Sequence, residues 1–237
     1  MVMAAGMIAL SESFRDMASG AQVLDALENL FCSFGATHFL ATGFPLPGRP
    51  IEPLIVRMNW CDVRPDRPGS AALRGDDPLL HRVLGTHRPF TWVDLPHDPS
   101  ANDSPLLASL VASPPMRVLA VPICAFLPYQ AVVVSAGSAL VIDTRTLLVV
   151  DHVVIEAFRR LLALGVVRPE RPGELSARER RVVELSASGK TAGEIAAILE
   201  ISQRTVHAHL QNASEKLAAH NKTHTVVEAL RYGQISV

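Results

Sequence analysis

The chain has 237 residues, 49% of them hydrophobic, and its formal net charge at pH 7 is −1. This length leaves room for two domains with a sizeable core, and the near-neutral charge excludes proteins that bind nucleic acid through bulk positive charge alone. No apolar run of the sequence approaches the ~20 residues that a membrane-spanning helix needs.

The N-terminal half begins with a predicted helix and two predicted strands. Apolar residues recur at helical spacing through residues 21–34 and stop at Gly35, which predicts an amphipathic helix. Residues 37–43 and 53–58 are apolar runs separated by a Pro- and Gly-rich turn at 45–50, and they predict two strands.

Further strands and a long helix complete this half. Residues 78–84 allow a short helix with Asp77 as its cap. Three more strands are predicted at residues 117–122, 130–135 and 139–142. Residues 144–164 predict a long, largely apolar helix. Helices and strands in this order predict an antiparallel sheet covered by helices, an α/β/α sandwich, within an α+β chain. Such a layer can enclose a small ligand between sheet and helix.

A Pro-containing linker at residues 166–173 divides the chain. We predict one domain over residues 1–165 and a second, all-α domain of four helices over residues 174–237. The second domain contains eight Lys or Arg residues and seven Asp or Glu residues. This near balance would not support binding to nucleic acid through bulk charge, so any such affinity would have to come from the positions of the cations and from dimerisation.

Three helix starts in the second domain carry capping residues. Ser176 is followed three residues later by a Glu, and Thr191 likewise, which predicts two capping boxes. Gly189 ends the first of these helices, and Ser202 begins the third. The short turn between the second and third helices predicts a helix-turn-helix unit, in which the third helix reads base edges.

The polar faces of the third helix supply the predicted DNA contacts. Arg204, His207 and Gln211 share an outer face that can reach base edges, and a flank carries residues that can bind phosphates. The predicted set is Gln203, Arg204, Thr205, His207, His209, Gln211, Asn212 and Lys216. The alternative is an ordinary solvated side of three packed helices.

The second domain resembles the DNA-binding domain of LuxR-type regulators. The matching residues are Leu175-Ser176-Ala177-Arg178-Glu179, Gly189-Lys190-Thr191, Glu194-Ile195-Ala196, Ser202, Thr205-Val206, His209, Lys216-Leu217, Asn221 and Gly233. The resemblance implies a transcription regulator of the quorum-sensing type without enzyme activity. The resemblance also implies that its partner is double-stranded DNA, at an operator whose two half-sites are related by a two-fold axis.

We predict a homodimer, because one such helix reads too few base pairs to be specific alone. A helix predicted at residues 223–231 carries Val226, Val227 and Leu230, which can supply the dimer face. The alternative is that this apolar face closes the domain's own core, and the two uses are compatible.

Two stretches of the first domain resemble the autoinducer-binding domain of the same family. They are Asp76-Asp77-Pro78 and Arg88-Pro89-Phe90-Thr91-Trp92. In the family, the Asp-Pro pair and the later Trp border a pocket for an acyl-homoserine lactone. The resemblance implies that Asp77 accepts a hydrogen bond from the ligand amide and that Trp92 packs against the lactone.

The same resemblance assigns Trp60, and Ser135 or its neighbour Val134, to the surroundings of the ligand's acyl carbonyl. Arg64 and Pro68 stand where the family has a Trp and a Tyr. An Arg can still donate to the ligand but needs a charge partner in an apolar cavity, and a Pro donates nothing.

Three alternatives therefore stay open. The first is a regulator gated by an acyl-homoserine lactone. The second is a regulator whose sensing domain has lost the lactone and acts without a ligand or on another small signal, and the altered Arg64 and Pro68 favour it over the first. The third is a protein that forms a heterodimer and sequesters another LuxR-type regulator. The intact third helix argues against the last of these, since a purely sequestering protein has no use for it.

No residue pattern predicts catalysis, a resident cofactor or a metal site. Cys32, Cys61 and Cys124 are widely spaced, which is typical of reduced thiols in a cytoplasmic protein. His207 and His209 are two residues apart on a helix and point apart, which disfavours zinc. Residues 1–10 are apolar but lack Lys and Arg and make a poor signal peptide. We predict a cytoplasmic protein that does not associate with membranes.

Overall fold

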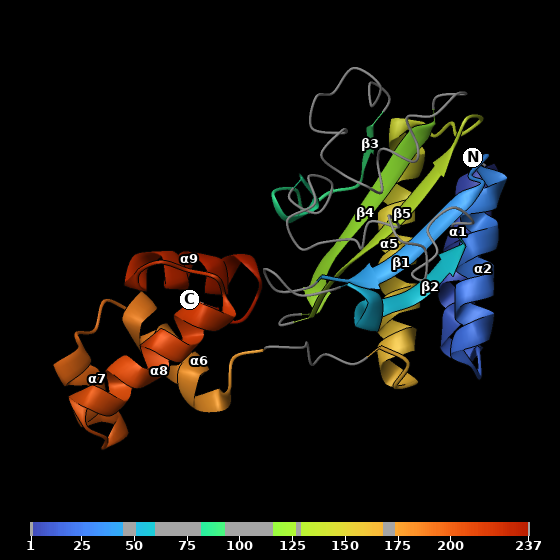
Figure 1. Cartoon of the computed structure of the whole chain (residues 1–237). Helices are drawn as coiled ribbons and strands as arrows, with labels where there is room; N and C mark the ends of the chain where they lie inside the picture. The colour runs from blue at the N-terminus through green and yellow to red at the C-terminus, as the bar shows by residue number, and fades with distance from the viewer. Residues whose placement is uncertain are drawn as a thin grey trace.

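The computed structural model describes residues 2–44, 51–59, 82–92, 116–126, 129–167 and 174–236. The elements fall into two units, an N-terminal antiparallel sheet with helices and a C-terminal group of helices to one side of it (Figure 1). This arrangement confirms the predicted α+β fold class. In the part of the chain that the structure describes, no helix is long and apolar enough to cross a lipid bilayer.

Five strands form one sheet in the order β2-β1-β5-β4-β3, and all neighbours pair antiparallel. The strands are β1 (His38–Gly43), β2 (Ile55–Asn59), β3 (Phe90–Trp92), β4 (Arg117–Phe126) and β5 (Tyr129–Gly137). The central strand β5 contains three consecutive Val residues, whose β-branched side chains favour a pleated, buried surface. The predicted strands at 37–43, 117–122 and 130–135 are confirmed. The strand predicted at 53–58 begins at Ile55, because Glu52–Leu54 forms a short 3-10 helix. The strand β3 was not predicted from the sequence.

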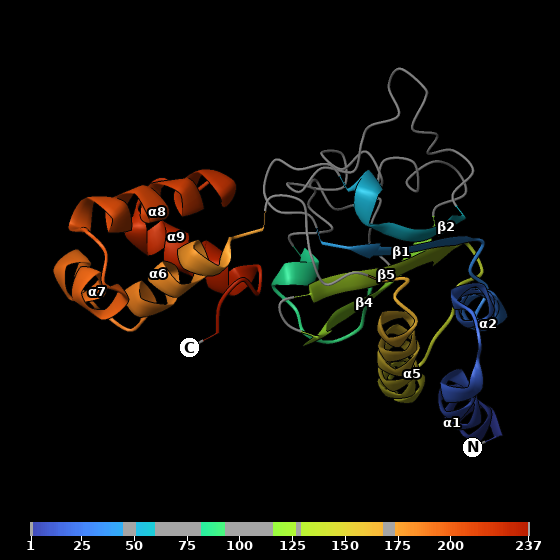
Figure 2. The same ribbon diagram turned by 90° about the horizontal axis from the view of Figure 1, so that it is seen from below.

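Three helices of the N-terminal unit lie on one side of this sheet (Figure 2). They are α1 (Val2–Ser13), α2 (Gly20–Ser33) and α5 (Thr144–Ala163). A capping box at Ser19 begins α2, and the Asp143 carboxylate accepts hydrogen bonds from two backbone N–H groups at the start of α5. The helices predicted at 21–34 and 144–164 are thus confirmed, whereas α1 was not predicted.

Alternating side chains give the sheet two buried faces. On the face covered by the helices, Phe39 and Val133 pack with Phe31 and Phe158. On the opposite face lies a second apolar cluster, which we call the Trp92 layer. It consists of Leu40, Phe44, Ile51, Val83, Trp92, Val118, Ala120, Val132, Val134 and Ala136.

The strand predicted at residues 139–142 is wrong. These residues form a turn and an irregular segment between β5 and α5. Leu140 N–H donates to the Gly137 carbonyl, and Val141 N–H donates to the Phe34 carbonyl at the end of α2. Backbone donors that bind this turn and the helix end cannot extend a β ladder. Of the helix predicted at residues 78–84, the structure describes only residues 82–84, and these are helical. Residues 78–81 lie outside the described residues.

The C-terminal unit is the four-helix domain that the sequence predicted. Its helices are α6 (Ala177–Ala187), α7 (Ala192–Leu199), α8 (Gln203–Lys216) and α9 (Lys222–Arg231). The capping boxes at Ser176 and Thr191 are both formed, and Ser202 caps α8. Gly189 follows α6 with a φ of 80°, the left-handed conformation expected at a helix end.

Leu84 of the N-terminal unit contacts the apolar clusters of both units. The Leu84 side chain contacts the Trp92 layer. It also packs against the cluster in the C-terminal unit that includes Leu175, Tyr232 and Ile235. The described structure therefore has a direct apolar contact between the sheet side that carries Trp92 and the core beneath α9.

Candidate functional site

The helix α8 is held in place by its buried side. Val206 is fully buried and packs with Val182 of α6 and Ile195 of α7. The turn before α8 passes through Glu200, which adopts a left-handed conformation with a φ of 55°. The Ser202 hydroxyl then accepts a hydrogen bond from the Thr205 N–H at 3.0 Å. Packing and capping together fix which face of α8 is exposed.

The exposed side of α8 carries most of the residues predicted to contact DNA. Five of them are exposed, namely Gln203, Arg204, His207, Gln211 and Asn212, and three are half-buried, namely Thr205, His209 and Lys216. No carboxylate of the described residues forms an ion pair with Arg204. The Gln211 amide donates to the Glu215 carboxylate at 2.9 Å, which leaves its carbonyl oxygen free to accept. This side of the helix therefore offers hydrogen-bonding groups of both kinds to a partner.

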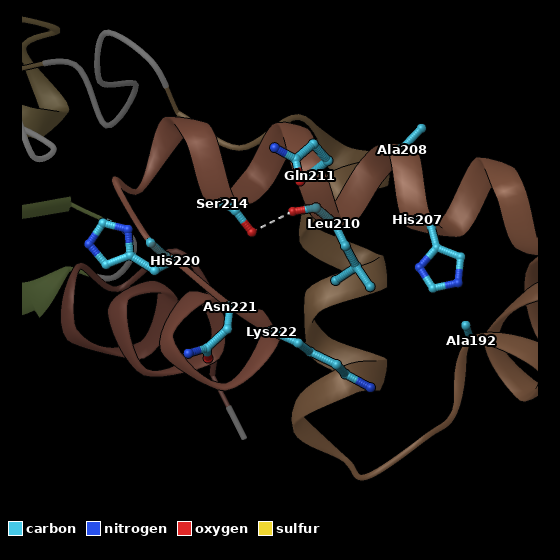
Figure 3. Close-up of a pocket in the computed structure, with 10 residues that line it drawn as sticks. Ala192, His207, Ala208, Leu210, Gln211, Ser214, His220, Asn221 and Lys222 are labelled. Carbon is cyan, nitrogen blue, oxygen red and sulfur yellow. Dashed lines mark hydrogen bonds between the residues drawn. The ribbon is translucent and has the colours of Figure 1, made fainter.

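A groove of about 710 Å³ adjoins this surface, between α8 and the start of α9. Figure 3 shows His207 and Gln211 along the α8 side and His220 and Lys222 along the other. Asn221 caps α9 by accepting from the His224 N–H at 2.9 Å. The sequence prediction missed His220 and Lys222, although Asn221 was among the residues that carried the family resemblance.

Lys222 is anchored at the edge of this groove. Its ammonium donates to the carbonyl oxygen of Lys190, which follows α6, at 2.9 Å. An ammonium carries three donors, and this bond uses one of them. The remaining charge and donors make the groove a suitable place for an anionic group.

Lys216 has partners inside the domain. Its ammonium lies 2.7 Å from the Glu179 carboxylate on α6 and donates to the Glu174 carbonyl oxygen at 3.2 Å. Only 6% of the Glu179 side chain is exposed, compared with 31% of the Lys216 side chain. The ion pair therefore ties the end of α8 to the start of α6, and a phosphate contact by Lys216 stays a prediction.

The Glu179 carboxylate is stabilised in its charged form. Burial alone raises the pKa of this group. The hydrogen bonds from the Lys216 ammonium and the Ser176 backbone N–H outweigh this effect and hold the pKa below its ordinary value. Glu179 is thus both the third residue of a capping box and the anion of a nearly buried ion pair.

Two of the predicted ligand-contacting residues are described, and they lie on opposite faces of the sheet. Trp92 is 4% exposed and belongs to the Trp92 layer. Ser135 pairs with Phe39 and Leu119, both of which belong to the face covered by the helices. This corrects the expectation for Ser135, because the alternative residue Val134 is the one that shares the face with Trp92. Trp60, Arg64 and Asp77, and also Pro68, lie outside the described residues.

A cation covers the aromatic end of the Trp92 layer. The Arg82 guanidinium carbon lies 4.6 Å from the Trp92 ring centroid and 5.0 Å from that of Phe90. Both distances fall within the ~6 Å range of cation–π attraction. The layer is therefore bounded by a positive charge at the end where β3 joins the sheet.

The fold and the exposed α8 face define the class of protein. The helices α7 and α8 form a helix-turn-helix unit, and its second helix, α8, exposes hydrogen-bonding groups. Such a unit attached to a separate sheet domain is typical of a DNA-binding regulator. Residues 173–229 match the family model described as "Bacterial regulatory proteins, luxR family".

Similarity to known regulators extends over most of the chain. The transcriptional activator protein BjaR1 of Bradyrhizobium diazoefficiens is 30% identical over 88% of this chain and 87% of its own length. The quorum sensing-dependent transcriptional regulator RpaR of Rhodopseudomonas palustris is 31% identical over 90% of this chain and 88% of its own. The structure of SdiA, a regulatory protein of Escherichia coli, in complex with octanoyl-rac-glycerol has a similar fold. Its TM-score is 0.54 at 23% identity, over 96% of this chain and 94% of that one.

The chain belongs to the LuxR family of bacterial regulatory proteins. It is a DNA-binding transcription regulator related to quorum-sensing regulators, and it is not an enzyme.

Proposed function

We propose that the protein is a dimeric, ligand-responsive regulator in the cytoplasm, and that α8 reads base edges in the major groove of a two-fold-related operator. The observation that carries this proposal is the exposed row of Arg204, His207 and Gln211 on α8, beside the groove that leads to Lys222. Arg pairs with guanine and Gln pairs with adenine through two hydrogen bonds each, so this row can select a sequence. Thr205, His209 and Asn212 flank the row and are proposed to position the helix on the backbone.

A dimer face on α9 is part of the proposal. Val226 packs inside the domain, whereas the Val227 and Leu230 side chains are 51% and 40% exposed. Apolar side chains that point to solvent on the same helix favour a contact with a second copy. A homodimer places two copies of α8 about one turn of DNA apart, as a two-fold operator requires.

The proposed ligand is a small signal that binds over the Trp92 layer. The complex of SdiA with octanoyl-rac-glycerol supports an acyl compound, and an acyl-homoserine lactone is the form that the resemblance implies. Trp92, Trp60, Arg64 and Asp77 are the proposed contacts. The exposed α8 face supports a regulator that binds DNA itself over one that only sequesters a related regulator in a heterodimer.

Changing Gln211 to Ala is expected to alter base preference at one position of each half-site by ~1–3 kcal/mol, because a two-bond contact to a base edge is lost. The operator is first selected from a random DNA library with the wild-type protein. Affinities for single-base operator variants are then compared between wild type and Gln211→Ala. Glu215→Ala, which removes only the internal partner of Gln211, is the control. If Gln211→Ala ranks all operator variants as the wild type does, the assignment of this face is wrong.

Changing Lys222 to Gln is expected to weaken binding to all operator variants about equally. The slope of log K against log salt concentration should decrease in magnitude by roughly 0.9, the value for one phosphate contact on B-DNA. Fluorescence anisotropy over a series of salt concentrations measures this slope. Arg145→Gln, which removes an exposed cation from α5, is the control and should leave it unchanged. An unchanged slope for Lys222→Gln would exclude a phosphate from this end of the groove.

A further inference from the structure

The Trp92 layer has an apolar middle and a polar end opposite Trp92. Trp92 pairs with Val118, and Val118 pairs with Ala136, so these residues mark one end. At the other end the Gln130 carbonyl accepts from the Phe44 N–H at 2.9 Å. Between Ala136 and Gln130 the strand advances roughly 20 Å, at about 3.3 Å per residue. Val132 and Val134 line the intervening face.

Gln130 lies on this face and has an unsatisfied oxygen. It alternates with Val132 and Val134 along β5 and therefore points to the same side of the sheet. The residue is 5% exposed, yet its carboxamide oxygen accepts no hydrogen bond from the part of the chain that the structure describes. Most buried polar groups in proteins are paired, and an unpaired one costs about 1–3 kcal/mol. Such a group is a candidate for pairing with a bound molecule.

A second buried polar group lies beside Gln130. Thr42 is fully buried and pairs with Val132, so on the same face it is a diagonal neighbour of Gln130, within about 8 Å. Its hydroxyl donates to the Gly43 carbonyl at 3.1 Å, which leaves its oxygen free to accept. Two acceptors together at the end of an apolar layer suit a partner that donates hydrogen bonds.

We propose that Gln130 is a ligand-specificity residue, which binds a hydroxyl group at the tail end of an acyl ligand. This inference rests on the proposed ligand binding over the Trp92 layer and names the ligand's chemistry more closely. A hydroxyl can both donate and accept a hydrogen bond. It can therefore pair with the Gln130 carboxamide whether the oxygen or the nitrogen of the carboxamide faces the ligand. The Arg82 cation over Trp92 gives the layer a polar group at the other end, so the matching ligand is polar at both ends and apolar between them.

The experiment measures binding of paired probes to the full chain. Each pair consists of an acyl compound and its ω-hydroxy counterpart, with octanoyl, decanoyl and dodecanoyl chains, on either homoserine lactone or glycerol. At the chain length that fits, the ω-hydroxy member should bind the wild type about tenfold more tightly, which corresponds to one net hydrogen bond. Gln130→Met, which has similar length but no polar group, should lose this preference and bind the plain member at least as tightly as wild type does. Gln130→Glu should retain the preference.

Ser135→Ala is the matched control. Ser135 is also buried on β5 with an unpaired oxygen, but it points to the opposite face of the sheet. Its removal should leave the preference for the ω-hydroxy probe unchanged. Loss of the preference in Ser135→Ala would mean that the effect of Gln130→Met is a general response of the strand, which overturns the proposal.

Thermal melting without ligand gives an independent readout. Because Gln130→Met removes an unpaired buried oxygen, its Tm without ligand should equal or exceed that of wild type. A clear fall in Tm would show that the oxygen is paired inside the fold, for example by a buried water, and would overturn the proposal. Equal binding of both members of every pair overturns it as well. If no probe binds wild-type protein that still binds its operator, ligand sensing itself fails and the proposal falls with it.

Discussion

A Val227→Lys variant is expected to be monomeric and to bind its operator roughly 10³-fold more weakly than wild type, because it loses the second half-site contact on which specific binding depends. Val227 is half-exposed on α9 and faces solvent in a single copy, so the change should leave the domain's own core intact. In a two-fold interface the substitution places two ammonium groups opposite one another, and juxtaposed like charges cost several kcal/mol. The added positive charge can only strengthen attraction to phosphates, so a loss of affinity cannot come from repulsion by DNA.

Ile198→Lys is the matched control for this variant. Ile198 is an apolar residue of the same domain, on α7, and at 49% it is as exposed as Val227. Its substitution should leave both oligomeric state and operator affinity within a few-fold of wild type. Sedimentation measures the mass of each variant, and gel-shift titration measures operator affinity. A Val227→Lys protein that remains dimeric and binds its operator normally would place the dimer contact elsewhere.

Helix boundaries in the C-terminal domain were predictable because the signals are local. Ser176, Thr191 and Ser202 each cap the backbone N–H groups of the turn that follows them, and this chemistry depends only on residues within three positions. Apolar spacing likewise fixed which side of α8 is buried, as Val206 and Ala213 demonstrate. The exposed face that we propose to contact DNA then followed from the same helix geometry.

Features that depend on distant contacts were not predictable in this way. A shift of one residue in strand register moves a side chain to the other face, which is why the sequence could not choose between Ser135 and Val134. The segment around Leu140 is as apolar as a strand, but its backbone binds the turn after β5 and the end of α2. The helix α1 has no marked polar face, and it is defined by its packing against α5. Lys216 meets Glu179 across 37 residues of sequence, which no local pattern reports.

Breaking the ion pair between Lys216 and Glu179 is expected to have a large effect on the stability of the domain. A Lys216→Met variant is expected to lose about 2–3 kcal/mol of unfolding free energy at pH 7. Removing one partner of a buried pair costs ~3–5 kcal/mol, and the partial exposure of Lys216 reduces this figure. The cost arises because the Glu179 side chain, of which 6% is exposed, loses its counter-charge and keeps the Ser176 N–H, at 2.7 Å, as a hydrogen-bond donor.

The pH dependence of this effect has a definite sign. Glu179 has a folded-state pKa below its ordinary value of 4.5, so its stabilising contribution is fully present above pH 4.5 and is lost as the pH falls through the lower, folded-state pKa. The stability difference between wild type and Lys216→Met should therefore shrink as the pH falls, because protonation of Glu179 removes the buried charge that the variant leaves unpaired. Urea unfolding at pH 7 and at pH 3, followed by circular dichroism, measures the two differences.

Two further variants separate the structural role of Lys216 from the predicted phosphate contact. The double variant Glu179→Gln/Lys216→Met removes both charges and should recover much of the lost stability, since no unpaired buried charge remains. If Lys216 also binds a phosphate, the double variant will still show a salt slope smaller by roughly 0.9 although it is folded. If the folded double variant has the wild-type salt dependence of DNA binding, Lys216 does not contact a phosphate. Its role is then purely structural: it holds the end of α8 against α6 and so keeps the row from Arg204 to Gln211 in position. A Lys216→Met protein as stable as wild type would contradict the ion-pair argument itself.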